Sequence, residues 1–217
     1  NQIASSTTFD ANGKRTTTYE NVTGTIESWF GGHWNKSYKK DAHLYKFYLG
    51  VNMGYDKSKG FTNSEQYVAD GFDCTPRVGF TYEYGELLTI NPNYRVTFNE
   101  TRYKNYVIES TSNVLHSLGL QTTSYWPKNW VFGNDFGYTY NSNISDDFKK
   151  DFYLWNTSLS YAFFDKKMTL KVKVYDILNQ NQSNSRTITP TTIRDEENTV
   201  LKRYVMFSLT YKIEKFA

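Results

Sequence analysis

The residues with the clearest chemical potential in this chain are His116 and Ser117, which are adjacent in the sequence. A histidine beside a serine suggests a general base and a nucleophile, the pair that many hydrolases use. Both residues fall in a segment whose alternating pattern predicts a β-strand. Neighbouring residues of a strand point to opposite faces, so these two side chains cannot act together. We therefore expect that the chain is not an enzyme.

An acidic run offers a further candidate. Asp195, Glu196 and Glu197 form an acidic run that suggests a cation site, although such a run in a polar segment is typically solvated. The sequence contains no nucleotide-binding loop and no metal-cysteine motif, and the single Cys74 cannot form an internal disulfide. We expect neither a cofactor nor a bound metal.

Composition narrows the class of protein. The 217 residues carry a net charge of only +3, which leaves no electrostatic footprint for nucleic acid. Aromatic residues make up 18%, with 19 Tyr, 15 Phe and 5 Trp, and tyrosine and tryptophan collect at membrane interfaces. No stretch of about 18 apolar residues exists, so a transmembrane helix is excluded.

The last stretch, from Arg203 to Phe216, has the clearest pattern. Large apolar residues alternate there with small or polar ones, which predicts a strand with one apolar and one wet face. Such a strand suits either a soluble sandwich or a membrane barrel. The apolar positions of this strand are Val205, Phe207, Leu209, Tyr211 and Ile213.

About ten strands of this kind follow one another, and no helical periodicity appears. Short turns ("NKSYKKDAH", "YGEL", "YWPKN", "FDKK") alternate with long polar loops, which we expect at about residues 57–74, 99–110 and 178–202. Residues 16–34 read as one long extended segment. Short turns on one side and long loops on the other are typical of an outer-membrane barrel, whereas a sandwich has no reason to segregate its loops.

The two faces of the predicted strands favour the same choice. Burying many charges in a sandwich core would cost several kcal/mol each, roughly, unless they were paired. We expect one face to line a polar lumen, where these charges form an anion path, contact a plug or simply pair: Arg77, Arg95, Asp135, Lys171 and Lys173. We expect the other face to carry an aromatic girdle: Tyr82, Tyr84, Trp130, Trp155, Tyr161 and Phe163.

Three motifs add a family resemblance. These are "VYDILNQN" (Val174 to Asn181), the ending from Arg186 to Phe216, and "WPKNW" at Trp126. The chain resembles the C-terminal barrel portion of Bacteroidetes outer-membrane proteins of the TonB-dependent receptor-like family. The resemblance implies an all-β, antiparallel up-and-down transmembrane barrel segment over residues 1–217, without a plug domain in this chain. The resemblance further implies that this segment closes a larger barrel, which in such transporters has about 22 strands.

The resemblance also implies a location and partners. The location is the bacterial outer membrane, with lipid around the barrel and the barrel-assembly machinery reading the last strand through Phe207, Leu209, Tyr211, Ile213 and Phe216. The implied function is ligand uptake, energised by a TonB-type protein through N-terminal parts outside this chain. Three alternatives stay open: a structural barrel subunit of an envelope assembly or secretion complex, an outer-membrane hydrolase, and a closed barrel of about ten strands.

Overall fold

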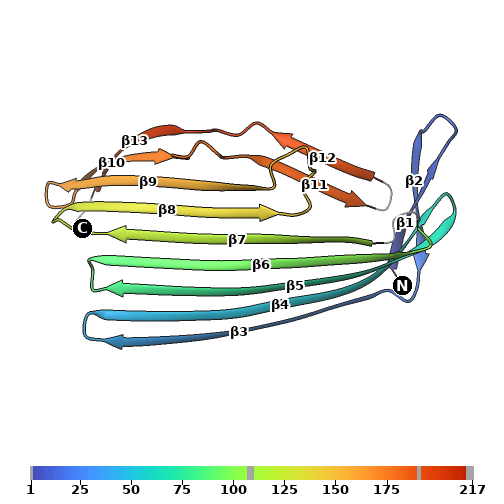
Figure 1. The fold of residues 1–217 in the computed structure, drawn as a ribbon, viewed down its shortest axis with the longest axis horizontal. Coiled ribbons are helices and arrows are strands. Elements are labelled where there is room, and N and C mark those ends of the chain that lie inside the picture. Colours follow the sequence, from blue (N-terminus) through green and yellow to red (C-terminus); the bar gives the residue numbers. More distant parts are fainter. Residues whose placement is uncertain (1, 107–109, 190–191, 214–217) are drawn as a thin grey trace.

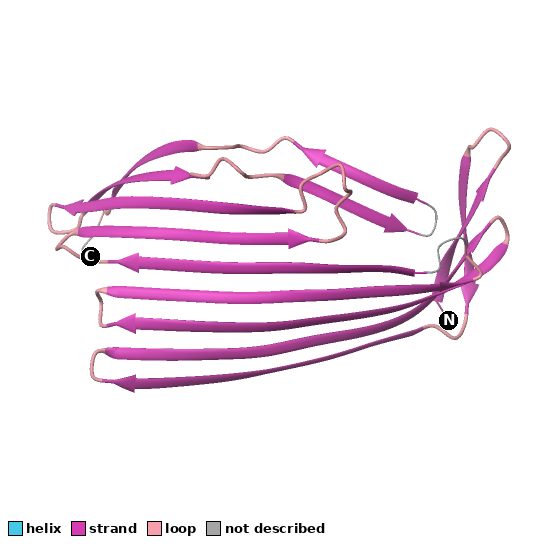
Figure 2. Cartoon of the chain, viewed as in Figure 1, coloured by secondary structure: helices cyan, strands magenta, loops and turns pink. Residues whose placement is uncertain are grey.

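The structure, a computed structural model, describes residues 2–106, 110–189 and 192–213, and its regular secondary structure in these ranges is all β-strand (Figure 2). The strands are β1 (Gln2–Phe9), β2 (Arg15–Val22), β3 (Ile26–Lys40), β4 (His43–Thr62), β5 (Glu65–Tyr84), β6 (Leu88–Lys104), β7 (Ser110–Ser124), β8 (Trp130–Asn141), β9 (Asp151–Phe163), β10 (Met168–Tyr175), β11 (Ser183–Thr189), β12 (Thr192–Asn198) and β13 (Tyr204–Tyr211).

One large antiparallel sheet dominates the molecule (Figure 1). In the part of the chain described, strands β3 to β10 and then β13 lie side by side, each hydrogen-bonded to its neighbour. The β11–β12 hairpin is an excursion between β10 and β13. The β1–β2 hairpin joins the far end of β4 through two parallel pairs, Ser6–Phe61 and Thr7–Thr62.

The four short turns that the sequence predicts all lie at one end of the large sheet. They connect β3 to β4, β5 to β6, β7 to β8 and β9 to β10 (Figure 1, left). Backbone φ angles are positive at Asp41 (53°), Gly85 (51°) and Asp165 (50°), a conformation that aspartate and glycine tolerate best. The other end carries the longer loops, together with one tight turn between β4 and β5, and we call it the loop end.

Two of the expected long loops are wrong. Strands β4 and β5 continue past the alternating region and meet in a two-residue turn, Asn63–Ser64, instead of a loop over residues 57–74. Strand β6 likewise runs on to Lys104. The sequence pattern ends early because both faces are polar there, whereas the backbone hydrogen bonds of the sheet continue regardless of the side chains.

Three other boundaries also differ from expectation. The extended segment at residues 16–34 is divided at Gly24, whose φ is 74°, into β2 and β3. Most of "NKSYKKDAH" belongs to β3, and only Asp41–Ala42 forms the turn. The expected loop at residues 178–202 contains the β11–β12 hairpin. The hairpins therefore raise the number of strands above the ten expected.

In the ranges that the structure describes, no second layer packs against the apolar face of the large sheet. Phe207 is 74% exposed and its cross-strand partner Val172 is half-buried, so neither lies in a water-excluded interior between two sheets. The described residues therefore do not form the two stacked sheets of a soluble sandwich. Among the described residues, buried apolar side chains are few: Ala4, Val22, Ala69, Val96 and Ile144.

The two edges of the large sheet run in the same direction. Strands β3 and β13 are the first and last of nine successive antiparallel strands in the described chain, so both point toward the short-turn end (Figure 1). Pairing these two edges directly would produce a parallel contact. An all-antiparallel barrel needs an even number of strands, as bacterial single-chain barrels have.

Candidate functional site

The strand register places all five predicted lumen residues on one face of the sheet, which we call the polar face. Residues that are directly paired across two strands share a face. Lys171 lies between Ser160 and Ser208, and Asp135 lies between Gln121 and Asn156. The remaining three, on the same face by the same register, are Arg77, Arg95 and Lys173.

Two contacts show how cations on the polar face are held. Lys46 Nζ donates to Glu83 Oε1 at 2.6 Å, in a partly exposed ion pair. Lys173 Nζ lies 4.2 Å from the ring centre of Tyr175, which in turn stacks on Tyr204 at 4.5 Å. The face is therefore wet but ordered, with charges held by aromatic rings as well as by acids.

The predicted girdle residues all lie on the opposite, apolar face. Tyr82, Trp130 and Tyr161 lie beside the short turns. The ring centres of Trp130 and Tyr161 are 4.8 Å apart. His43 adds to this belt through a 2.8 Å hydrogen bond between its Nδ1 and the Tyr82 hydroxyl. Trp155 differs, because it lies toward the loop end. Tyr84 and Phe163 complete the belt at the short-turn end.

Toward the loop end, the apolar residues of this face stop at a row of charged residues. Lys57, Asp70 and Arg102 are direct cross-strand partners on β4, β5 and β6. The uninterrupted band on β4 runs from His43 to Tyr55. At about 3.3 Å per residue and a tilt near 45°, that length gives a height of roughly 28 Å, close to the hydrocarbon thickness of a bilayer.

The predicted assembly residues lie on the edge strand. Phe207, Leu209 and Tyr211 occupy the apolar face of β13 and are 74%, 62% and 61% exposed. Within the described residues, β13 pairs only with β10, so its other edge is open. Ile213 follows the strand and is also exposed, whereas Phe216 lies outside the described residues.

His116 and Ser117 are not brought together. His116 lies on the apolar face, where its Nδ1 is 2.6 Å from the Tyr94 hydroxyl. Ser117 lies on the polar face beside Arg95. The acidic run is also divided, because Asp195 pairs with Arg186 across the hairpin and Glu196 with Arg194. In the described ranges, no group of three His, Cys, Asp or Glu side chains is placed to hold a metal ion.

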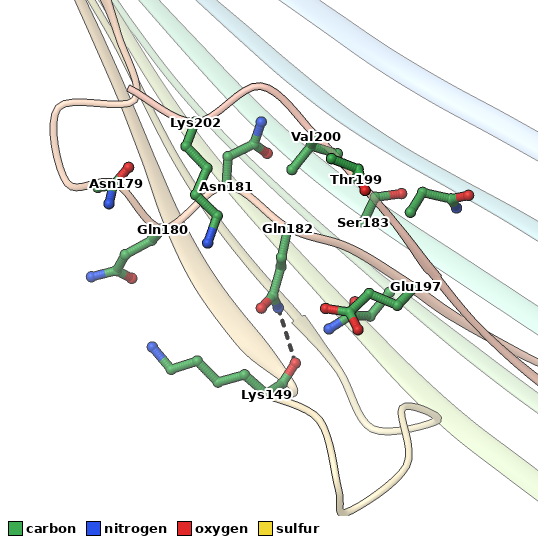
Figure 3. A pocket seen from close by; sticks show the side chains of 12 residues that line it. Lys149, Asn179, Gln180, Asn181, Gln182, Ser183, Glu197, Thr199, Val200 and Lys202 are labelled. Atoms are coloured by element: carbon green, nitrogen blue, oxygen red, sulfur yellow. Dashed lines mark hydrogen bonds between the residues drawn. The ribbon is translucent and has the colours of Figure 1, made fainter. Parts of the chain in front are cut away.

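A pocket at the loop end was not predicted from the sequence. It has a volume of about 540 Å³ and lies between the connection that follows β10 and the end of the β11–β12 hairpin (Figure 3). The only signal in the sequence is the amide run "NQNQ" after Leu178. Its lining is dominated by amides: Asn179, Gln180, Asn181, Gln182, Asn184 and Asn198, with Lys149 and Lys202.

Four of the side-chain amides in the pocket are each fixed by a hydrogen bond through one group, either the NH₂ or the C=O. Gln182 Nε2 donates to the Lys149 carbonyl at 2.9 Å (Figure 3), and Asn181 Nδ2 donates to the Leu201 carbonyl at 2.9 Å. Asn179 and Gln180 are held the other way, as acceptors of backbone N–H groups at 3.3 Å. Within the described residues, the second group of each anchored amide has no hydrogen-bond partner, which leaves the pocket both donors and acceptors for a ligand.

Asp176 positions this amide run. Its side chain is buried, and it accepts hydrogen bonds from the backbone N–H groups of Gln180 (2.9 Å) and Asn181 (3.0 Å). The Asp176 N–H donates to Asn156 Oδ1 at 2.9 Å, which ties the turn to β9. The φ of Asp176 is 49°, a left-handed conformation that aspartate tolerates better than most residues.

A sequence profile of the outer membrane protein beta-barrel family matches residues 74–211, which is most of the large sheet. The chain belongs to this family. It is accordingly a bacterial outer-membrane protein, as predicted. No curated protein and no solved structure matches the chain. Among the described residues, no helix is long and apolar enough to span a membrane.

Membership of the outer membrane protein beta-barrel family gives each face its environment. In such barrels the apolar band contacts lipid, aromatic residues line the interfaces, and the interior is polar. The matched region contains every residue of the predicted lumen set and girdle. We therefore expect the charged row of Lys57, Asp70 and Arg102 at the level of the lipid headgroups on the loop side.

The β11–β12 hairpin carries a pH-sensitive ion pair outside the membrane band. Arg186 donates to the Asp195 carboxylate through Nε (2.6 Å) and Nη2 (2.8 Å). These hydrogen bonds, more than the charge of Arg186 itself, hold the pKa of Asp195 below its ordinary value. The stabilisation is thus fully present above the ordinary carboxyl pKa and is lost as the pH falls through the lowered one.

We predict that Arg186→Gln increases hydrogen exchange in β11 and β12 at neutral pH but not in acid. Wild type and variant are compared by mass spectrometry at the same pH, so intrinsic exchange rates cancel. At neutral pH only the wild type retains the pair, whereas in strong acid both proteins lack it. A difference that persists unchanged in acid would show that the pair does not stabilise the hairpin.

Proposed function

We propose that this barrel is a TonB-dependent receptor-like protein that takes up a ligand across the outer membrane. The observations that support the proposal are the polar face of the sheet and an amide-lined pocket among the connections at the loop end. A wall of this kind supports passage of a polar solute. A barrel that serves only as a scaffold has no need of an entry pocket with preset hydrogen-bond groups.

The pocket favours a neutral, hydroxyl-rich solute as the ligand. Its side-chain amides offer hydrogen-bond donors and acceptors that are already oriented, which lowers the entropic cost of binding a ligand. Hydroxyl groups use both kinds of partner at once. Lys149, Lys202 and Glu197 at the same pocket carry mixed charge and so do not select for one sign.

We further propose that additional strands complete the barrel. Edges β3 and β13 run the same way, so an odd number of added strands restores antiparallel pairing throughout. The chain then forms the C-terminal segment of a larger barrel, whose last strand is recognised by the assembly machinery. Energy from a TonB-type protein would act through a plug in parts outside this chain, and the barrel would contact other envelope proteins.

The test is accumulation of radiolabelled stachyose, a tetrasaccharide, by cells that make the full-length protein. We expect several-fold more accumulation than in a deletion strain, and its loss on treatment with a protonophore. Gln182→Ala in the pocket should reduce accumulation, whereas Gln66→Ala at the tip of β5 should not. Equal accumulation in both strains, with the protein recovered in a stoichiometric envelope complex, would instead favour the structural subunit.

A further inference from the structure

Two arginines of the polar face stand directly opposite each other. Arg77 on β5 and Arg95 on β6 are cross-strand partners, so their side chains leave the sheet side by side. Like charges in this position destabilise a sheet. A pair of this kind requires a compensating group.

The described residues around the pair supply no acid. The same row holds Gly50 beside Arg77 and Ser117 beside Arg95. Toward the short turns the nearest carboxylate on β5 is Glu83, which is paired with Lys46. Toward the loop end it is Asp73, which lies two rows from Arg77 and extends over Gly54. The adjoining rows on these strands contain only neutral residues: Tyr48, Asn52, Thr75, Gly79, Asn93 and Thr97. In the ranges described, neither arginine forms a salt bridge with an acid.

Arg77 is held in place but left partly unpartnered. The amide of Asn52, in the orientation that satisfies both its ends, accepts from Arg77 Nη2 and donates to the Val51 carbonyl. The Nε of Arg77 is buried and has no acceptor within the described structure. A buried donor without a partner costs free energy, which an incoming acceptor would recover.

Small residues leave room beside the two arginines. A Cβ added at Gly79 would meet only Tyr48, at 3.6 Å from its Cβ and 3.9 Å from its Cδ1, so this chain itself does not require glycine there. At Gly50, by contrast, a Cβ would lie 2.6 Å from the Tyr48 hydroxyl. The absence of a side chain at Gly50 therefore lets Tyr48 bring its hydroxyl next to the row of Arg77.

We propose that Arg77, Arg95 and the Tyr48 hydroxyl form an oxyanion site on the wall of the lumen. Guanidinium groups match carboxylate and phosphate oxygens through paired N–H donors, and the hydroxyl adds a further donor. The oxyanion belongs either to a small solute or to an acidic side chain of a polypeptide segment inside the lumen. The site goes beyond the proposed uptake, because it is expected in a transporting and in a structural barrel alike.

The test compares thermal unfolding midpoints of the full-length protein in detergent micelles. Each protein is measured in chloride and in inorganic phosphate at the same ionic strength. The variants are Arg95→Gln and Arg77→Gln. The matched control is Lys171→Gln, which removes the same charge from the same face between Ser160 and Ser208. Arg95→Lys keeps the charge, and it serves as the informative variant if the glutamine variants do not fold.

The sign of the effect decides between the outcomes. If the oxyanion is a solute, phosphate raises the midpoint of wild type by several degrees, and the arginine variants lose this shift. If it is a protein carboxylate, phosphate has no effect, and Arg95→Gln lowers the midpoint below that of Lys171→Gln. If no oxyanion binds, Arg95→Gln relieves repulsion, so a midpoint equal to or above that of Lys171→Gln without a phosphate shift overturns the proposal.

Discussion

Asp176→Asn is expected to destabilise the loop end of the barrel by about 1–3 kcal/mol, and Asp176→Ala by about 3 kcal/mol or more. The asparagine can serve only one of the two backbone N–H groups that the carboxylate now accepts, at 2.9 and 3.0 Å. Asp176 is 1% exposed, so water cannot replace the lost acceptor. Alanine loses both bonds and also tolerates the φ of 49° poorly.

The effect of Asp176 is measured by urea unfolding in lipid vesicles, followed by tryptophan fluorescence. Asp165→Asn is the matched control, because Asp165 has the same backbone conformation (φ of 50°) in an exposed turn. The control should unfold like wild type. Equal stability of Asp176→Asn and Asp165→Asn would mean that the buried carboxylate does not hold the turn. Loss of the turn should also disorder the amide pocket, since Gln180 and Asn181 depend on it.

Leu118→Arg is expected to cost about 2–4 kcal/mol of barrel stability, because it places a charge on the lipid face. Leu118 is 41% exposed in the middle of the apolar band, between Tyr94 and Tyr138. Gln121→Arg on the same strand is the matched control. Gln121 lies on the polar face directly opposite Asp135, so the new charge gains water and a carboxylate.

Refolding of both variants into vesicles gives the comparison for Leu118. The expected result is reduced stability and insertion for Leu118→Arg and near wild-type behaviour for Gln121→Arg. Similar losses for the two variants would contradict the assignment of the two faces. The reverse order would mean that the polar face contacts lipid, which the charges of Arg77 and Lys171 make energetically unfavourable.

Much of this protein follows from its sequence. Alternation of residues such as Phe207 and Ser208 defines a two-faced strand, because side chains of an extended chain point alternately to each side. The parity of short and long connections then indicates a barrel, and the family match confirms the outer-membrane fold and location. The assignment of Lys171 to the polar face and of Tyr161 to the apolar face was predictable for the same reason. Alternation within each strand divides its polar side chains from its apolar ones.

Only the tertiary structure decided which side chains meet. Arg77 and Arg95 lie directly opposite each other because of the register between β5 and β6. Alternation predicts that both side chains lie on the polar face, but it does not predict which residues are paired. The pocket amides and Asp176 lie in a connection without any period, where hydrogen bonds to distant backbone groups determine the conformation. Strand ends beyond the lipid band, as at Lys104, were also hidden from the sequence, because backbone pairing continues where the contrast between the two faces has ended.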